Sequence, residues 1–209
     1  MKKLLALVLA LVMSMSLVTI SNAAFKDADK IDYKEAVDVM NAVGVFIGDE
    51  KGNFNAKDNL TREQAAKIIA YLELGEKAAD ALVGSATFTD VASNYWANTA
   101  ISTMANMGVF KGRTADRFDP NAPITRGEFA AVCARFDDSK VKTTETYSDI
   151  NGYWAANEIL RAAALGWVQG YQDGSYRPNN SITRAQVVTM INRVLCRMPE
   201  ENADLLKGM

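Results

Sequence analysis

Three arginines stand at the same position of a repeated motif, and the chemistry that they could perform is the binding of an anion. Each follows a threonine that has a Glu or Gln three residues after it, in Thr61-Arg62-Glu63-Gln64, Thr125-Arg126-Gly127-Glu128 and Thr183-Arg184-Ala185-Gln186. This capping box predicts that a helix begins at each arginine. A cation there faces the positive end of the helix dipole, which costs about 0.3 kcal/mol. A bound anion would offset that cost, because the guanidinium group and the helix N-terminus both favour it.

An internal ion pair is the structural alternative for the same arginines. An acid stands two residues after an aromatic residue at the start of each copy of the motif, and these acids are Asp27, Asp90 and Asp149. A salt bridge from each arginine to such an acid would also explain the repeated charge. The physics of the sequence leaves the anion site and the internal bridge equally open.

The absence of histidine and the balance of charge exclude several classes of function. The 209 residues include no His, two Cys, 23 Lys+Arg and 25 Asp+Glu, for a formal net charge of -2. Without His, a Ser-His-Asp or Cys-His catalytic site and a His-ligated zinc site are excluded. The charge balance argues against nucleic-acid binding, which needs a surplus of clustered Lys and Arg. We therefore expect a protein that is not an enzyme and has no cofactor or metal.

The elements that position the arginines come in three copies of one unit. An offset of 58 residues aligns Gly108 with Gly166, and an offset of 64 aligns Phe54 with Phe118; both offsets also align the Thr-Arg pairs. A unit of this length is too short to bury a core alone, so the copies must pack on one another. The fold class expected is mainly α, with two helices and a connecting loop in each copy.

The second copy predicts the elements most clearly. Apolar residues recur at helical spacing over 95–107, which predicts a first helix that ends in a left-handed cap at Gly108. Extended chain then leads to the second helix at Arg126. In the third copy, Asp173-Gly174 predicts a tight turn.

Aromatic residues and turn acids are further candidates. Tyr95-Trp96 and Tyr153-Trp154 open the first helix in two copies, and their spacing favours a place in the core over a stacking surface for a sugar ring. Asp49, Glu50 and Asp173 lie in turns. Their spacing disfavours a calcium loop, which needs alternating oxygen ligands and a Glu at position 12.

The N-terminal 23 residues have the pattern of a secretory signal peptide. Two lysines precede an apolar stretch over 4–18, and Ser21 and Ala23 form a cleavage site. The apolar stretch is shorter than the roughly 20 residues of a membrane span, so we expect none after cleavage. Export would permit a disulfide between Cys133 and Cys196, but their apolar surroundings favour buried thiols.

The combined motifs resemble the S-layer homology (SLH) domain. They are the aromatic-x-Asp start, Tyr-Trp-Ala at the first helix, the segment 170–178 and Ile-Thr-Arg-Ala-Gln over 182–186. The resemblance implies a pseudo-threefold spindle of three SLH repeats around a central helical bundle. It also implies grooves between the repeats that bind a secondary cell-wall polysaccharide, often through its pyruvate ketal. Carried over by position, the ligand-binding residues are Arg62, Arg126, Arg184, Asp27, Asp90, Asp149, Trp96 and Trp154.

The resemblance also predicts the organisation of the chain and its function. The expected parts are a signal peptide (1–23), three repeats (24–74, 88–137 and 147–196), linkers (75–87 and 138–146) and a tail (197–209). The function implied is non-covalent anchoring of an exported protein to the bacterial cell wall or S-layer, with an anionic, pyruvylated, peptidoglycan-associated polysaccharide as partner. A scaffold protein with internally bridged arginines is the alternative, and a glycosidase with two acids is a weaker one.

The first two copies depart from the family pattern. Ile31-Asp32 replaces Tyr-Trp in the first copy, and Ala56 replaces a proline, so we expect a weak or empty first groove. In the second copy, Gly127 stands where a helix former is usual, which predicts a looser helix cap.

Overall fold

A computed structural model of the chain describes residues 25–82, 88–135, 141–142 and 144–197. Over these ranges the protein contains seven α-helices, one 3-10 helix and no strand, which confirms the mainly α class. The predicted signal peptide lies outside the described residues. Among those residues, none of the helices combines the length and apolar character that a membrane span requires.

Each repeat contributes a first and a second helix. The first helices are α2 (Lys34–Ala42), α5 (Asn98–Asn106) and α7 (Ala156–Ala164), and the second helices are α3 (Arg62–Leu74), α6 (Arg126–Ala134) and α8 (Arg184–Val194). A 3-10 helix, η1 (Ala28–Lys30), precedes α2. Segment 75–87, expected to be a linker, carries the short helix α4 (Glu76–Ala81), which contacts α3 and α5.

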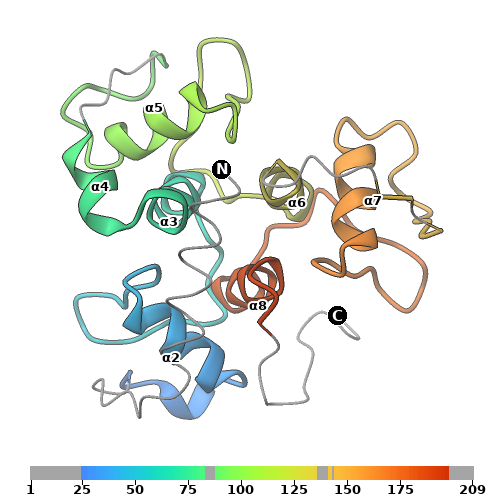
Figure 1. The fold of residues 1–209 in the computed structure, drawn as a ribbon, viewed down its shortest axis with the longest axis horizontal. Helices are drawn as coiled ribbons and strands as arrows, with labels where there is room; N and C mark the ends of the chain where they lie inside the picture. Colours follow the sequence, from blue (N-terminus) through green and yellow to red (C-terminus); the bar gives the residue numbers. More distant parts are fainter. Residues whose placement is uncertain (1–24, 83–87, 136–140, 143, 198–209) are drawn as a thin grey trace.

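The second helix of each repeat packs against the first helix of another repeat, in cyclic order. Helix α3 contacts α5, α6 contacts α7, and α8 returns to α2. In Figure 1 the second helices are seen end-on near the middle, and the first helices form three outer lobes. This arrangement means that no repeat completes its own core. The pseudo-threefold symmetry of the spindle stays a prediction.

Three buried residues join the repeats by a ring of backbone hydrogen bonds. The N–H of Leu60 donates to the carbonyl oxygen of Ile182 (3.0 Å), Ile182 donates to Ile124 (3.1 Å), and Ile124 donates to Leu60 (2.9 Å). All three side chains have no exposed surface. Because each residue directly precedes a Thr-Arg pair, the ring brings the starts of the three second helices together at the centre.

The helix ends follow the sequence signals, with two corrections. All three capping boxes are present, and Gly108 ends α5 at a left-handed φ of 71°. The α5 helix begins at Asn98 instead of Tyr95, because residues 95–97 form a turn whose Tyr95 carbonyl oxygen accepts from Asn98 N–H (2.9 Å). The cap before α6 is not loosened by Gly127, since Thr125 N–H donates to Glu128 Oε2 at 2.9 Å.

Packing between two repeats explains why residue 127 is a glycine. A Cβ atom at this position would lie 2.6 Å from Oη of Tyr153, well inside van der Waals contact. Tyr153 belongs to the turn that opens α7, and α6 and α7 are in contact. The glycine therefore lets the second and third repeats approach closely.

The two cysteines are both free thiols. Cys133 is buried in α6, as expected, but Cys196 is exposed just after α8. The expectation of a buried thiol is wrong for Cys196, because the chain leaves the core there at a left-handed φ of 55°.

Candidate functional site

The backbone amides at the start of the second helices are already bonded, which changes the expected anion site. Arg62 N–H donates to the carbonyl oxygen of Ala122 (3.0 Å) and Glu63 N–H to that of Pro120 (3.0 Å). The third amide, of Gln64, donates to the Thr61 hydroxyl (3.4 Å). The other two second helices repeat this pattern. These helix-start N–H groups are therefore committed to the protein and are not available to a bound anion.

Each arginine side chain binds two backbone carbonyl groups of another repeat. Arg62 donates to Phe118 (Nε, 2.8 Å) and Lys111 (Nη2, 2.9 Å). The same pair of bonds joins Arg126 to Tyr176 (3.0 Å) and Gln169 (3.1 Å), and Arg184 to Phe54 (2.8 Å) and Ile47 (2.8 Å). The guanidinium groups also lie over the rings of Phe118, Tyr176 and Phe54, at 4.6, 4.8 and 4.8 Å from the centroids. These contacts give the repeated arginine a structural role.

Burial affects the pKa of two of these arginines. It lowers the pKa of the Arg62 and Arg184 guanidinium groups from their ordinary value, while nearby acids, Glu128 for Arg62 and Asp58 for Arg184, oppose the shift. Because arginine starts from so high a pKa, both groups stay charged at neutral pH.

The acids that open the repeats do not form salt bridges with the arginines of the Thr-Arg pairs. The internal ion pair expected between them is therefore wrong. Asp27 accepts the backbone N–H groups of Phe54 and Asn55 in its own repeat, at 2.7 and 2.8 Å. Asp90 and Asp149 do the same 27–29 residues further along the chain. Burial alone would raise the pKa of the Asp27 and Asp90 carboxyls, but the donated hydrogen bonds hold it below its ordinary value. These acids shape the loops and do not line the pockets described below.

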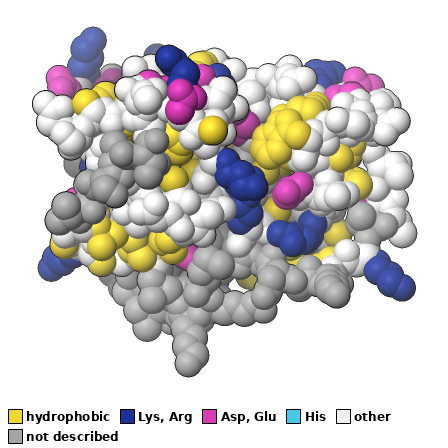
Figure 2. All heavy atoms as spheres, turned by 90° about the horizontal axis from the view of Figure 1, so that it is seen from above, with side chains coloured by type: hydrophobic (Ala, Val, Ile, Leu, Met, Phe, Trp, Pro, Cys, Tyr) yellow, Lys and Arg dark blue, Asp and Glu magenta, His cyan; other side chains and the backbone are white. Residues whose placement is uncertain are grey.

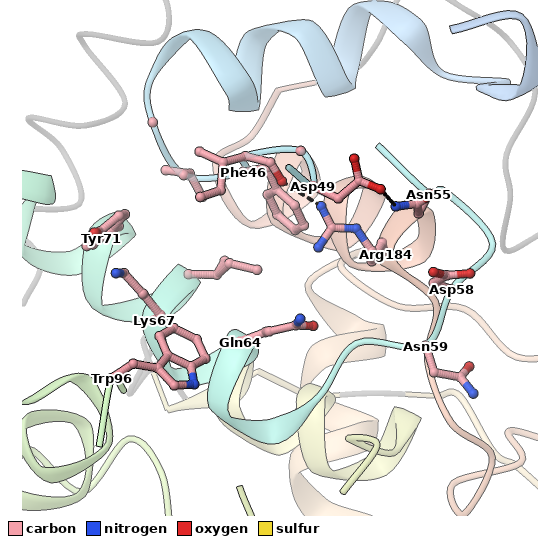
Figure 3. A pocket seen from close by; sticks show the side chains of 15 residues that line it. Phe46, Asp49, Asn55, Asp58, Asn59, Gln64, Lys67, Tyr71, Trp96 and Arg184 are labelled. Atoms are coloured by element: carbon pink, nitrogen blue, oxygen red, sulfur yellow. Dashed lines mark hydrogen bonds between the residues drawn. The ribbon is translucent and has the colours of Figure 1, made fainter. Parts of the chain in front are cut away.

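One pocket lies beside Arg184 and is built from all three repeats (Figure 3). Its volume is about 420 Å³. The first repeat supplies its loop over 44–59 together with Gln64, Lys67 and Tyr71 of α3, the second supplies Trp96, and the third supplies Arg184. The Lys67 ammonium group lies 5.5 Å from the centroid of the Trp96 ring. The pocket thus combines an aromatic wall with two cations, Lys67 and Arg184, and two carboxylates, Asp49 and Asp58.

A second pocket repeats this arrangement one unit further along. Its volume is about 490 Å³, and it is lined by Arg62, the loop over 110–113, Glu128 of α6, Arg135 just after α6, and Trp154. Each of these corresponds by repeat position to a residue of the first pocket. Here, however, Arg62 is paired with Glu128, whose Oε1 lies 3.0 Å from Arg62 Nη1 and 3.2 Å from Arg113 Nε.

The exposed fraction of each tryptophan shows whether its side chain lies in the core or at the surface. Trp96 and Trp154 are 53% and 58% exposed, whereas Trp167 is 7% exposed. The expectation that the repeat-opening tryptophans lie in the core is wrong, because the turn before each first helix directs them out of it. Figure 2 shows a face where hydrophobic side chains lie beside interspersed basic and acidic ones.

The way the repeats share each pocket shows which groove lacks a tryptophan. Each pocket takes its tryptophan from the repeat after the one that supplies the loop. Asp32 replaces that tryptophan in the first repeat, and α2 contacts α8. By repeat position the departure therefore concerns the loop of the third repeat, whose carbonyl groups Arg126 binds. The expectation of a weak or empty first groove stays a prediction.

The turn acids hold their own loops. Asp49 Oδ1 accepts from Lys51 N–H (2.9 Å) and Asn53 N–H (2.8 Å), and Asp173 Oδ1 accepts from Ser175 N–H (2.9 Å). The predicted turn at Asp173-Gly174 is confirmed by a φ of 79° at the glycine.

Comparison with known proteins identifies the family to which these repeats belong. The family profile described as "S-layer homology domain" matches residues 24–66, 87–130 and 146–188. The chain belongs to the SLH domain family. It is 35% identical over 187 residues to "Cell surface glycoprotein 1" and 36% identical over 162 residues to "Cellulosome-anchoring protein", both of Acetivibrio thermocellus, and 31% identical over 204 residues to "Surface-layer 125 kDa protein" of Lysinibacillus sphaericus.

The matches cover most of this SLH chain but a minor part of each relative. They include 81%, 74% and 93% of the chain, and 8%, 36% and 16% of the three relatives. The shared unit is therefore the set of SLH repeats.

Sequence reasoning missed two pocket residues of the first SLH repeat. Gln64 was interpreted only as a helix cap and Lys67 was not singled out, yet both line the pocket beside Arg184. Their positions relative to the Thr-Arg pair could have indicated them, because residues three and four apart share one helix face.

Proposed function

We propose that this chain is a non-catalytic module that anchors an exported protein to the bacterial cell wall by binding an anionic, pyruvylated secondary wall polysaccharide. The observation that carries the proposal is the pocket beside Arg184, where three repeats supply a loop, an exposed tryptophan and two cations. A guanidinium group recognises a carboxylate, and an indole face suits the apolar face of a sugar ring.

The relatives support the same proposal for location and for an anchoring role. Their names place them at the cell surface, in a surface layer or as a cellulosome anchor. We extend this to the present chain as a secreted protein of the cell wall or S-layer, held to a peptidoglycan-associated polysaccharide. Within this proposal the binding residues are Arg184, Arg62 and Arg126 with Trp96 and Trp154.

A scaffold that contacts other surface proteins is the second candidate. Its support is that all three arginines bind carbonyl groups of a neighbouring repeat, so folding alone explains a repeated cation. The candidates differ in whether a polysaccharide is needed for retention on the wall.

Sedimentation with purified bacterial walls tests the proposal. The chain should sediment with walls that carry the polysaccharide and stay in the supernatant with walls from which it has been extracted. Retention should fall as salt is raised from about 0.05 to 0.5 M, concentrations over which the Debye length shortens from about 14 to 4 Å. Equal retention on both kinds of wall would favour the scaffold.

A variant comparison controls for folding. Lys67 is partly exposed and its ion pair is a long one, 4.0 Å to Asp80 of α4, so Lys67→Ala should keep the fold and weaken retention. Lys77→Ala removes the same charge from an exposed position of α4, outside the pocket, and should change neither the fold nor the retention.

A further inference from the structure

Part of the Arg184 pocket is built from residues outside the SLH matches. The first match ends at residue 66 and the second begins at residue 87. Helix α4 lies between them, and so do Lys67 and Tyr71, which line the pocket from α3. This side of the pocket is therefore a feature of the chain that the family profile does not cover.

Lys67 lies close to two aromatic rings of the pocket. Its ammonium nitrogen is 5.2 Å from the centroid of the Tyr71 ring and 5.5 Å from that of the Trp96 ring. Tyr71, Lys67 and Trp96 follow one another along one side of the pocket (Figure 3). A cation within about 6 Å of a ring centroid is attracted by the ring. The three side chains thus form one continuous wall, with two members from the first repeat and one from the second.

Helix α4 holds this wall through Asp80. The Tyr71 hydroxyl donates to the Asp80 carboxylate, and both carboxylate oxygens lie 2.9 Å from it. Lys67 is a weaker partner, because its ammonium nitrogen is 4.0 Å from Asp80 Oδ1 and the two side chains are 31% and 57% exposed. Asp80 therefore acts on the wall mainly through the hydroxyl group of Tyr71.

A second contact joins α4 to the pocket. Gly44 lines the pocket just after α2, and a Cβ atom on this residue would lie 3.2 Å from Oε2 of Glu76. The Ala79 side chain is buried, and α4 contacts α3 of the first repeat and α5 of the second. The helix is thus fixed against both repeats beside the pocket.

We propose that Asp80 is a positioning residue for the Arg184 pocket and that α4 is, through it, part of the ligand site. Asp80 is not itself a residue that lines the pocket. It holds the Tyr71 ring, and with it Lys67 and Trp96, in the arrangement that a saccharide meets. Side chains that are already held lose less rotational freedom when a ligand binds. This inference rests on the proposed function and adds to it a determinant outside the SLH matches.

Two substitutions of Asp80 separate its hydrogen bond from its charge. Asp80→Ala removes both, and the affinity for purified walls that carry the polysaccharide, measured by sedimentation, should fall about threefold. Asp80→Asn keeps an oxygen that accepts from Tyr71 and should recover most of that loss, because the exposed ion pair with Lys67 contributes little. Tyr71→Phe keeps the ring, removes the donor and should match Asp80→Ala. Lys77→Ala on the same helix is the control.

Two tryptophan backgrounds show whether the effect arises in this pocket. In a Trp154→Ala background, which weakens the Arg62 pocket, Asp80→Ala should again lower the affinity for the walls about threefold. In a Trp96→Ala background, which weakens the Arg184 pocket, the same change should have a much smaller effect. General destabilisation would lower the affinity equally in both. Urea unfolding checks the fold, and α4 itself should persist because alanine is a better helix former than aspartate.

The outcomes separate this inference from the proposed function. If the unmodified chain does not sediment with walls that carry the polysaccharide, the proposed function fails and the inference fails with it. If the unmodified chain sediments and Asp80→Ala binds as tightly, the inference alone is overturned. A full loss for Asp80→Asn, or equal losses in the two tryptophan backgrounds, also overturns the inference and leaves the proposed function standing.

Discussion

The Nε–H of Arg184 donates a hydrogen bond of 2.8 Å to the backbone carbonyl oxygen of Phe54, which lies 130 residues earlier in the chain. This bond closes the cycle of repeats, because it joins the last second helix to the loop of the first repeat. Arg184, which we propose as a ligand contact, is therefore also part of the interface between the repeats.

Replacement of this arginine should destabilise the protein. Arg184→Ala removes the donors for the carbonyl groups of Phe54 and Ile47. The buried Phe54 carbonyl left unpaired costs about 1–3 kcal/mol, whereas water can bind the exposed Ile47 carbonyl. Urea unfolding should show this loss, and Arg184→Lys should recover only part of it, since an ammonium group lacks the planar fork. Lys77→Ala is the control, and an unchanged midpoint for Arg184→Ala would contradict the interface role.

Asp90→Asn should lower the stability in a pH-dependent way. The folded protein holds the pKa of this carboxyl below its ordinary value, so its contribution is complete above pH of about 4 and is lost as the pH falls through the folded pKa. At pH 7 we expect a loss of about 1–3 kcal/mol, because Asn can accept only one of the two backbone bonds.

The difference between Asp90→Asn and the unmodified chain should then narrow as the pH is lowered from about 4 to 2 in urea titrations. Asp29→Asn, at an exposed position of η1, is the control for the removal of one carboxylate. A difference that stays constant with pH would exclude the charged form of Asp90 as the source.

Gly127→Ala should destabilise the chain although alanine is the better helix former. The added Cβ would meet Oη of Tyr153 at 2.6 Å, and we expect a loss of about 1 kcal/mol by thermal or urea unfolding. In a Tyr153→Ala background the obstacle is removed, so the same change should become neutral or stabilising. A stabilising effect in the unmodified chain would show that Tyr153 moves aside freely.

Trp96→Ala should separate binding from folding. The side chain is 53% exposed, so unfolding should change by less than about 0.5 kcal/mol. Wall retention should fall about tenfold, which corresponds to about 1.4 kcal/mol. By contrast, Trp167→Ala should cost about 3–5 kcal/mol of stability, because this side chain is 7% exposed. Unaltered retention for Trp96→Ala would remove it from the proposed site.

The two cysteines should label at different rates with a maleimide. Cys196 is exposed and should react in the folded protein. Cys133 is buried, and burial raises the pKa of its thiol, so it should react only after unfolding in urea. Mass spectrometry after brief labelling should find one modified cysteine, and two would contradict the burial of Cys133.

Local signals determined the elements of the fold. The capping boxes, the left-handed Gly108 and the Asp173-Gly174 turn all depend on hydrogen bonds between residues a few positions apart, which the sequence displays directly. The repeat itself predicted that three short units share one core, and the cyclic helix contacts agree with this.

Tertiary structure decided the partners of the charged and aromatic side chains. The sequence alone allowed Asp27 to bridge an arginine and allowed Trp96 to lie in the core. In the fold, Asp27 binds its own loop, while Arg184 and Trp96, from different repeats, line one pocket with Lys67. The physical reason is that these partners depend on which repeat's loop lies against which helix, and that is decided by packing between segments far apart in the chain. The sequence by itself determined the repeats, their helix caps and an unexplained arginine in each. Only the packing showed that this arginine binds another repeat and that Arg184 lines a pocket together with an exposed indole.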